Sequence, residues 1–86
     1  MKTLHAFVSG HVQGVGFRWH VRQWAHHLGI KGWVRNLEDD RVELQAQGDR
    51  LEEFLQQVRR GPSGSRVQSV QEHWLEGISL GPFEIR

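Results

Sequence analysis

Two stretches of the chain place apolar residues at helical spacing. In residues 21–28 and again in residues 51–58, apolar side chains fall at positions i, i+3, i+4 and i+7, which puts them on one face of a helix. Asp49, with Glu52 three residues later, has the spacing of a capping box at the start of the second helix, and Gly61-Pro62 is expected to end it. The apolar positions are Val21, Trp24, Ala25 and Leu28 in the first stretch and Leu51, Phe54, Leu55 and Val58 in the second.

Strand patterns flank and separate these predicted helices. In residues 4–9 and 42–47 every second residue is aliphatic, which is typical of a strand with one buried face. Residues 32–37 and 67–75 are less regular but predict two further strands, and residues 83–85 can add a short last one. The predicted order is therefore strand, helix, strand, strand, helix, strand.

This order, with a single apolar face on each helix, predicts two layers in which both helices pack on one face of a sheet. With right-handed crossovers the arrangement is a ferredoxin-like split βαβ fold (βαββαβ) of the α+β class, with a four- to five-stranded, mainly antiparallel sheet. The 86 residues suit a single domain spanning residues 1–86. Because this fold hosts many functions, the function has to be argued from a site.

Composition and charge remove several classes of function. Lys and Arg number 11 and Asp and Glu 10, a formal net charge of +1 with no block of like charge, so we expect no general affinity for nucleic acid or for a membrane surface. The chain has no cysteine, which excludes disulfides and thiol chemistry. Residues 1–5 lack the apolar stretch of a signal peptide, and no segment approaches the roughly 20 apolar residues of a transmembrane helix. We therefore expect a cytoplasmic protein.

A glycine-rich loop, Gly14-Val15-Gly16-Phe17-Arg18, joins the first predicted strand to the first predicted helix. Such a loop gathers backbone N–H groups, the helix N-terminus adds positive potential, and the glycines let a tetrahedral anion approach the backbone closely. The guanidinium of Arg18 can bind phosphate oxygens in a bidentate manner. The loop matches neither the dinucleotide fingerprint nor the P-loop, and a tight turn with a surface arginine is the alternative.

Residues 10–18 (GHVQGVGFR) are similar to the signature G-x-V-Q-G-V-x-F-R of the acylphosphatase family, with every fixed position filled. Residues 32–43 (GWVRNLEDDRVE) resemble a second family block, G-aromatic-V-x-N-x-x-D-G-x-V-E, with Asp40 standing where the family usually has glycine. Gly61-Pro62 and the ending Phe83-Glu84-Ile85 also fit, so the resemblance covers nearly the whole chain. Because aspartate tolerates positive φ less well than glycine, we expect an altered turn or slightly lower stability from Asp40.

The resemblance implies hydrolysis of the carboxyl–phosphate anhydride of a small-molecule acyl phosphate, with no metal and no organic cofactor. It also implies that Arg18 binds the phosphate group, that Asn36 positions the attacking water, and that inorganic phosphate competes for the same site. The likeness to this family favours a monomer. The expected catalytic residues are Arg18 and Asn36, and the expected phosphate-binding residues are Gln13, Gly14, Val15, Gly16, Phe17 and Arg18.

The two expected catalytic side chains limit the chemistry. Arg18 stays protonated and the amide of Asn36 does not titrate, so neither is a general base at neutral pH. If they are the working pair, the protein contributes positioning and charge stabilisation rather than proton transfer. This suits an acyl phosphate, because its carboxylate leaving group needs no protonation, whereas a simple phosphate ester releases an alkoxide.

Other residues could carry different chemistry. The six histidines show no metal-ligand spacing, and the adjacent His26 and His27 point to different faces of a helix. His20 is close enough to Arg18 in sequence to act as a base or to tune the pocket. Asp39-Asp40 is interpreted as a polar turn, since a magnesium site would also need a phosphate nearby. We predict no metal site.

The four tryptophans differ in their expected environments. Trp24 is expected in the core, whereas Trp19, Trp33 and Trp74 are either core residues or contacts for an acyl group.

Two rival functions come from other classes of protein. An RNA-binding module of the same fold needs aromatic residues on a central strand, and residues 41–47 contain none. The other rival is a non-hydrolytic module that binds acyl or carbamoyl phosphate, from which phosphate release would distinguish an enzyme.

Overall fold

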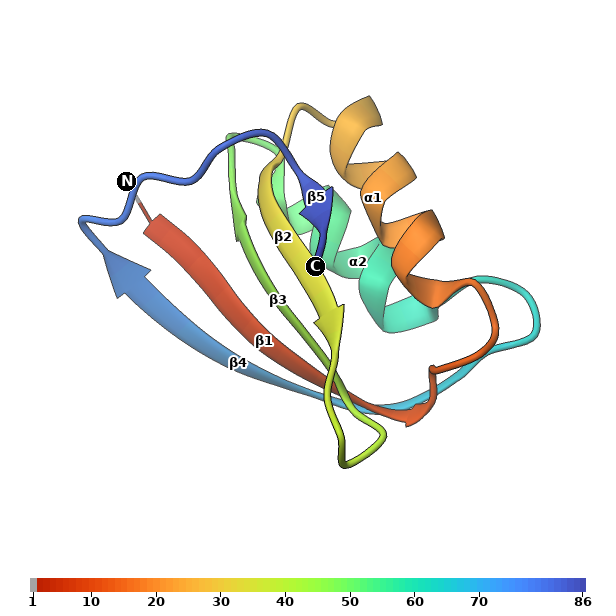
Figure 1. Cartoon of the computed structure of the whole chain (residues 1–86). Coiled ribbons are helices and arrows are strands. Elements are labelled where there is room, and N and C mark those ends of the chain that lie inside the picture. Colours follow the sequence, from red (N-terminus) through yellow and green to blue (C-terminus); the bar gives the residue numbers. More distant parts are fainter. Residues whose placement is uncertain (1) are drawn as a thin grey trace.

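The computed structural model of the protein describes residues 2–86 and has the predicted order of elements (Figure 1). Both helices lie on the same face of one sheet, which gives the two expected layers. Across residues 2–86, no helix has the length and apolar character needed to cross a membrane. The elements are β1 (Lys2–His11), α1 (Phe17–His27), β2 (Lys31–Asn36), β3 (Val42–Gln47), α2 (Leu51–Arg60), β4 (Arg66–Glu76) and β5 (Glu84–Ile85).

The sheet has five strands in the order β4-β1-β3-β2-β5. β1 pairs antiparallel with both β3 and β4, and β2 pairs antiparallel with β3. The short β5 runs parallel to β2, with Val34 opposite Ile85. The predicted α+β, ferredoxin-like arrangement is therefore confirmed, and the parallel pairing of β5 places the end of the described chain beside the end of α1 that follows the glycine loop (Figure 1).

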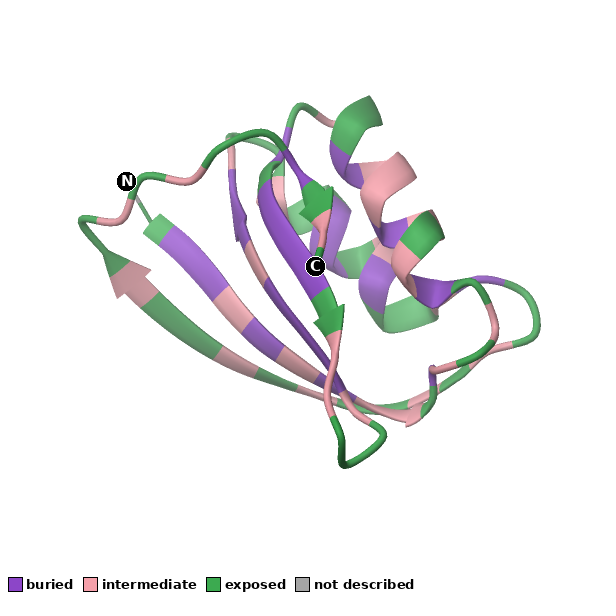
Figure 2. Cartoon of the chain, viewed as in Figure 1, coloured by how far each residue is buried: buried purple, intermediate pink, exposed green. Residues whose placement is uncertain are grey.

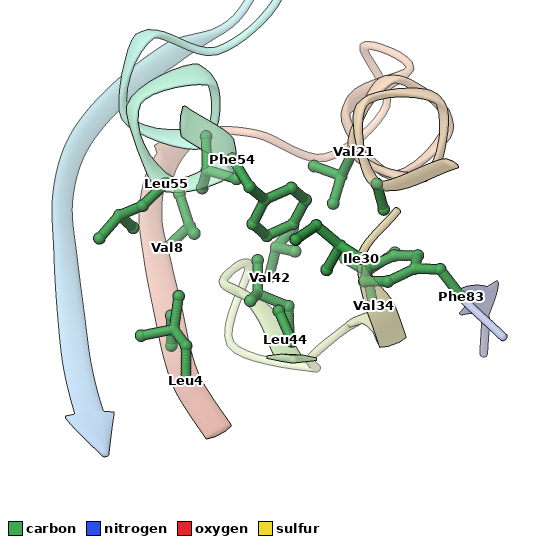
Figure 3. Packing of buried hydrophobic residues seen from close by; sticks show 14 of the residues in the cluster. Leu4, Val8, Val21, Ile30, Val34, Val42, Leu44, Phe54, Leu55 and Phe83 are labelled. Carbon is green, nitrogen blue, oxygen red and sulfur yellow. The ribbon is translucent and has the colours of Figure 1, made fainter. Parts of the chain in front are cut away.

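Aliphatic residues of the central strands and the inner faces of both helices form one core. Figure 2 shows buried positions alternating along the middle of β1, as the sequence pattern predicted, whereas nearly all of β3 is buried. Phe54 of α2 is fully buried and lies edge-on to Phe83, with ring centroids 5.9 Å apart (Figure 3). Burying a side chain of this size contributes about 1.5–3 kcal/mol. The buried pairs between the two strands are Leu4 with Ala46, Ala6 with Leu44, and Val8 with Val42.

On the face of the sheet without helices, some side chains of the central strands bury one another. The expectation that β3 buries one face is wrong for Glu43, which is only 7% exposed. Its carboxylate accepts hydrogen bonds from Nε2 of His5 at 2.7 Å and from Nε of Arg35 at 2.6 Å. Desolvation raises the pKa of Glu43, but these hydrogen bonds and the positive charges outweigh it and lower the pKa. Trp33 is also buried, beneath the guanidinium groups of Arg35 and Arg86 at 5.5 and 5.0 Å from its ring centroid.

The start of α2 differs from the prediction. The capping box of Asp49 and Glu52 is wrong, because the helix begins one residue later and its N-cap is Arg50, without a side-chain capping bond. The third helical residue is therefore Glu53, whose carboxylate accepts hydrogen bonds from the guanidinium of Arg50 at 2.9 and 2.6 Å. The other end is as expected, since Gly61 is the C-cap.

Candidate functional site

The loop between β1 and α1 has the backbone geometry of an anion-binding nest. Gly14 and Gly16 lie in the left-handed region at φ 74° and 76°, while Val15 between them does not. Alternation of left- and right-handed residues turns successive N–H groups toward one concave side. Glycine adopts positive φ without the cost of a Cβ atom, so the sequence places its glycines where this alternation requires them.

The backbone N–H groups of this loop are free to donate hydrogen bonds to a ligand. Within residues 2–86, no acceptor receives a hydrogen bond from the amides of Gly14, Val15, Gly16 or Phe17. These amides directly precede and open α1, whose N-terminal end carries positive potential and whose first turn holds no acidic residue. The loop therefore combines unpaired donors with a field that favours an anion.

A cleft of about 160 Å³ opens beside this loop and contains both expected catalytic residues. Its size is below the roughly 300–1,000 Å³ of pockets for drug-sized ligands, which indicates a small ligand or one group of a larger one. Among residues 2–86, no carboxylate and no histidine side chain lines it. The lining residues are Val12, Gly14, Gly16, Phe17, Arg18, Trp19, Asn36 and Ile85.

Arg18 brings a positive charge to the cleft that no carboxylate neutralises. It forms no ion pair and no side-chain hydrogen bond with another residue of the described chain 2–86. An unpaired guanidinium at a helix N-terminus retains all its donors for an incoming anion. By contrast, five arginines elsewhere are paired with carboxylates, namely Arg35, Arg41, Arg50, Arg59 and Arg86.

Asn36 reaches the cleft from a different part of the sheet. It is the last residue of β2 and lies opposite Val42 of β3. Its Oδ1 atom is buried and accepts no hydrogen bond from residues 2–86. A buried amide oxygen without a partner costs free energy, and the residue that carries it lines the cleft.

The side chain of Gln13 is used to hold the hairpin between β2 and β3. Its Nε2 donates to the carbonyl oxygen of Leu37 at 2.8 Å and to that of Arg41 at 2.9 Å. An amide nitrogen has two hydrogens, and both are engaged, so this side chain has no donor left for a phosphate. Gln13 is also absent from the lining of the cleft. In this structure the side chain of Gln13 therefore holds the residue that follows Asn36 and directs no donor into the cleft.

His20 supports the loop instead of lining the cleft. Its Nδ1 donates to the carbonyl oxygen of Gly16 at 2.8 Å, which fixes the ring against the residue that caps α1. The backbone N–H of His20 bonds to the same oxygen at 3.1 Å. The expectation that His20 tunes the pocket is compatible with this contact, whereas a role as base lacks support because the ring is not among the lining residues.

The hairpin turn holds an aspartate in a conformation that favours glycine. Asp40 has φ 72°, the left-handed region expected from its place in the family pattern. The amide of Leu37 donates to the carbonyl of Arg41 at 2.8 Å and closes a three-residue hairpin loop. In a common loop of this length, the last residue adopts the left-handed conformation. Asp39 pairs with Nε of Arg41 at 2.8 Å. Within residues 2–86, no three histidine, aspartate or glutamate side chains gather as metal ligands would.

The tryptophans divide into three environments. Trp33 is buried, and Trp24, which was expected in the core, is partly buried and packs against it. Trp19 and Trp74 are exposed, at 52% and 46%. Trp19 lines the cleft, and Trp74 lies at the other end of the sheet.

Sequence reasoning missed two residues of the cleft, Val12 and Ile85. Val12 lies in the signature of residues 10–18 and could have been found there. Ile85 has no local signal, because it reaches the cleft through the parallel pairing of β5 with β2.

Comparison with known proteins gives the same family by sequence and by structure. A family model of acylphosphatase matches residues 4–85. An acylphosphatase of Anaeromyxobacter sp. (strain Fw109-5) is 47% identical over 85 residues, covering 95% of this chain and 91% of that protein. The crystal structure of acylphosphatase from Bacillus subtilis has a TM-score of 0.95 at 34% identity, covering 100% of this chain and 99% of that one. An acylphosphatase structure from Coxiella burnetii has a TM-score of 0.92 at 36% identity, covering 99% and 92%. The chain belongs to the acylphosphatase family.

Proposed function

We propose that the chain hydrolyses acyl phosphates to a carboxylate and inorganic phosphate, with Arg18 and the loop from Gly14 to Phe17 holding the phosphoryl group and Asn36 orienting the water. Membership of the acylphosphatase family supports the reaction class. The observation that carries the assignment of residues is the cleft beside the glycine loop, which is lined both by Arg18, whose guanidinium is unpaired, and by Asn36, whose buried amide oxygen has no partner.

The division of labour follows from the donors and acceptors of the cleft. The loop amides and Arg18 are donors only, and they match the three oxygens of a transferring phosphoryl group, over which the loose transition state spreads its charge. Oδ1 of Asn36 is an acceptor and can take a hydrogen bond from a water molecule, but not from a phosphate oxygen. The two sets of groups therefore bind the two reactants at adjacent positions.

The reaction needs no group that titrates near neutral pH. The water oxygen bonds to phosphorus while the bond from phosphorus to the bridging oxygen breaks, and the acyl carboxylate leaves with that electron pair. A proton of the water passes to a phosphate oxygen, so the products are a carboxylate and dihydrogen phosphate. The protein lowers the barrier by holding the reactants together and stabilising charge. This fits a cleft lined by no carboxylate and no histidine.

The test is steady-state hydrolysis of benzoyl phosphate in excess EDTA. We expect Arg18→Gln to lower kcat/KM by about 10³-fold, as removal of a positive charge from a phosphoryl-transfer site does. Asn36→Ala should lower kcat by about 10²- to 10³-fold, because it removes the positioning of the water. Arg60→Gln is the matched control, since Arg60 is exposed at the end of α2 and does not line the cleft.

Three outcomes would contradict the proposal in different ways. Near-wild-type turnover by folded Arg18→Gln or Asn36→Ala protein would refute the assigned roles. Loss of activity in EDTA would refute hydrolysis without metal. Binding of benzoyl phosphate with no repeated release of phosphate would favour the non-hydrolytic binding module.

A further inference from the structure

The cleft has two chemically different halves. One half presents the hydrogen-bonding groups to which the phosphoryl group is assigned, and the other presents apolar side chains. The hydrogen-bonding half consists of Gly14, Gly16, Arg18 and Asn36, and the apolar half consists of Val12, Phe17, Trp19 and Ile85. In the described part of the chain, Arg18 is the one charged residue of the lining, so the apolar half offers nothing to a charged substituent.

Trp19 is the most exposed member of the apolar half, since Ile85 is partly buried. Val12 and Phe17 are each only 1% exposed and serve as walls that the core already holds, whereas Trp19 is 52% exposed. Across residues 2–86, Trp19 and Trp74 are the large hydrophobic side chains left exposed. An indole can bury about 150–250 Å² and accepts aromatic rings face to edge or offset, so an uncovered one beside a binding site is a platform for an apolar group.

The indole of Trp19 is braced against the glycine loop. The ring of His20 lies edge-on to it, with centroids 5.0 Å apart and an interplanar angle of 84°. Nδ1 of His20 is bonded to the carbonyl oxygen of Gly16, and its ring also lies 6.0 Å from that of Trp24. The same histidine therefore contacts the loop and the exposed indole, which fixes the position of the apolar platform relative to the phosphate donors.

We propose that Trp19 is a specificity-determining residue that contacts the acyl group of the substrate and favours acyl phosphates with an aromatic or branched apolar acyl group over acetyl phosphate. This inference rests on the proposed function. In an acyl phosphate a single bridging oxygen joins the acyl carbon to phosphorus, so an acyl group has to lie directly beside the bound phosphoryl group. Trp19 follows Arg18 in the first turn of α1, and both residues line the same small cleft.

The experiment compares kcat/KM for benzoyl phosphate and for acetyl phosphate in wild type, Trp19→Ala, Trp19→Phe and Trp74→Ala. The ratio of the two values cancels any difference in the fraction of folded enzyme, because both substrates are measured on one preparation. We expect the benzoyl-to-acetyl ratio to fall about tenfold in Trp19→Ala and to remain close to wild type in Trp19→Phe, which keeps an aromatic face. Trp74→Ala, which removes a similarly exposed tryptophan outside the cleft, should not change the ratio.

The inhibition constant for inorganic phosphate, measured in parallel, reports the phosphate half of the cleft alone. A ratio that stays at the wild-type value in Trp19→Ala while phosphate still inhibits would overturn the role of Trp19 and leave the proposed function intact. An equal fall in Trp74→Ala would overturn it too, since the effect would then not be local. Absence of hydrolysis of both substrates by the wild-type protein would instead overturn the proposed function, and this inference with it.

Discussion

Replacement of Gln13 by methionine tests whether this residue positions the hairpin or binds phosphate. Methionine keeps the length of the side chain but removes both donors to the carbonyl oxygens of Leu37 and Arg41. A net hydrogen bond contributes about 0.5–1.5 kcal/mol. Because the carbonyl of Arg41 keeps its bond from the amide of Leu37, one oxygen alone loses its partner, and we expect a loss of about 1–2 kcal/mol of unfolding free energy.

The catalytic effect should exceed the effect on binding. Leu37 directly follows Asn36, so freeing its carbonyl loosens the end of β2 that presents Asn36 to the cleft. A displacement of about 1 Å at a reacting group can cost about 10²-fold in rate, and we expect kcat to fall by about 10- to 100-fold. The inhibition constant for inorganic phosphate should change little, because the side chain of Gln13 has no donor directed to the phosphate. In Arg18→Gln, by contrast, that constant should rise by about 10- to 100-fold, since charge-assisted hydrogen bonds are lost.

The assay pairs urea unfolding with steady-state hydrolysis and phosphate inhibition, and Gln47→Met is the control. Gln47 is a buried glutamine near the far end of β3 that donates to Oγ1 of Thr3 and to the carbonyl of Ile78 and accepts from the amide of Leu80. Its replacement should cost stability without lowering kcat. If Gln13→Met weakens phosphate inhibition as much as Arg18→Gln does, the positioning role is refuted and the phosphate-binding role expected from the sequence is restored.

Two further predictions concern stability. Glu43→Gln should lower the unfolding free energy by about 1–2 kcal/mol at pH 7, since the charge-assisted bonds from His5 and the half-exposed Arg35 are weakened. Because folding lowers the pKa of Glu43, its contribution to stability is complete above the ordinary pKa of 4.5 and is lost as pH falls through the folded pKa. Urea unfolding at pH 7 and pH 3 should therefore show the difference in unfolding free energy between wild type and variant shrinking in acid. A constant difference would contradict this. Asp40→Gly should stabilise the protein by roughly 0.5 kcal/mol and Asp40→Ala should destabilise it, because φ is 72°; equal melting temperatures for the two variants would show that the turn carries no strain.

The sequence predicted the features that depend on neighbouring residues. Aliphatic residues at every second position determined the inner face of β1, and the glycine spacing predicted the turn at Gly14 and Gly16, where positive φ is found. The start of α2 was predicted one residue early. A capping bond from Asp49 would start the helix at residue 50, whereas the ion pair between Arg50 and Glu53 accompanies a start at Leu51, and both contacts join residues close in sequence. A pattern of residue types does not rank two local contacts of similar energy.

The features that the sequence did not predict depend on contacts between distant residues. The burial of Glu43 arises because His5 and Arg35 come from two different strands and cover it. The role of Gln13 follows from bonds to residues 24 and 28 positions later. In both cases the residue type is compatible with exposure to solvent, and pairing across the sheet decides otherwise.

The same distinction separates the two halves of the candidate site. The groups assigned to phosphate are contiguous between Gly14 and Arg18, so one strand-to-helix junction carries them and a short motif is enough to find them. Asn36 comes from another strand, and its position depends on the register of the hairpin and on Gln13. Substitutions in the loop should therefore weaken phosphate affinity, whereas substitutions in the hairpin should slow turnover at unchanged affinity. A hairpin variant that lost phosphate affinity and turnover in proportion would mean that the two halves form one inseparable unit.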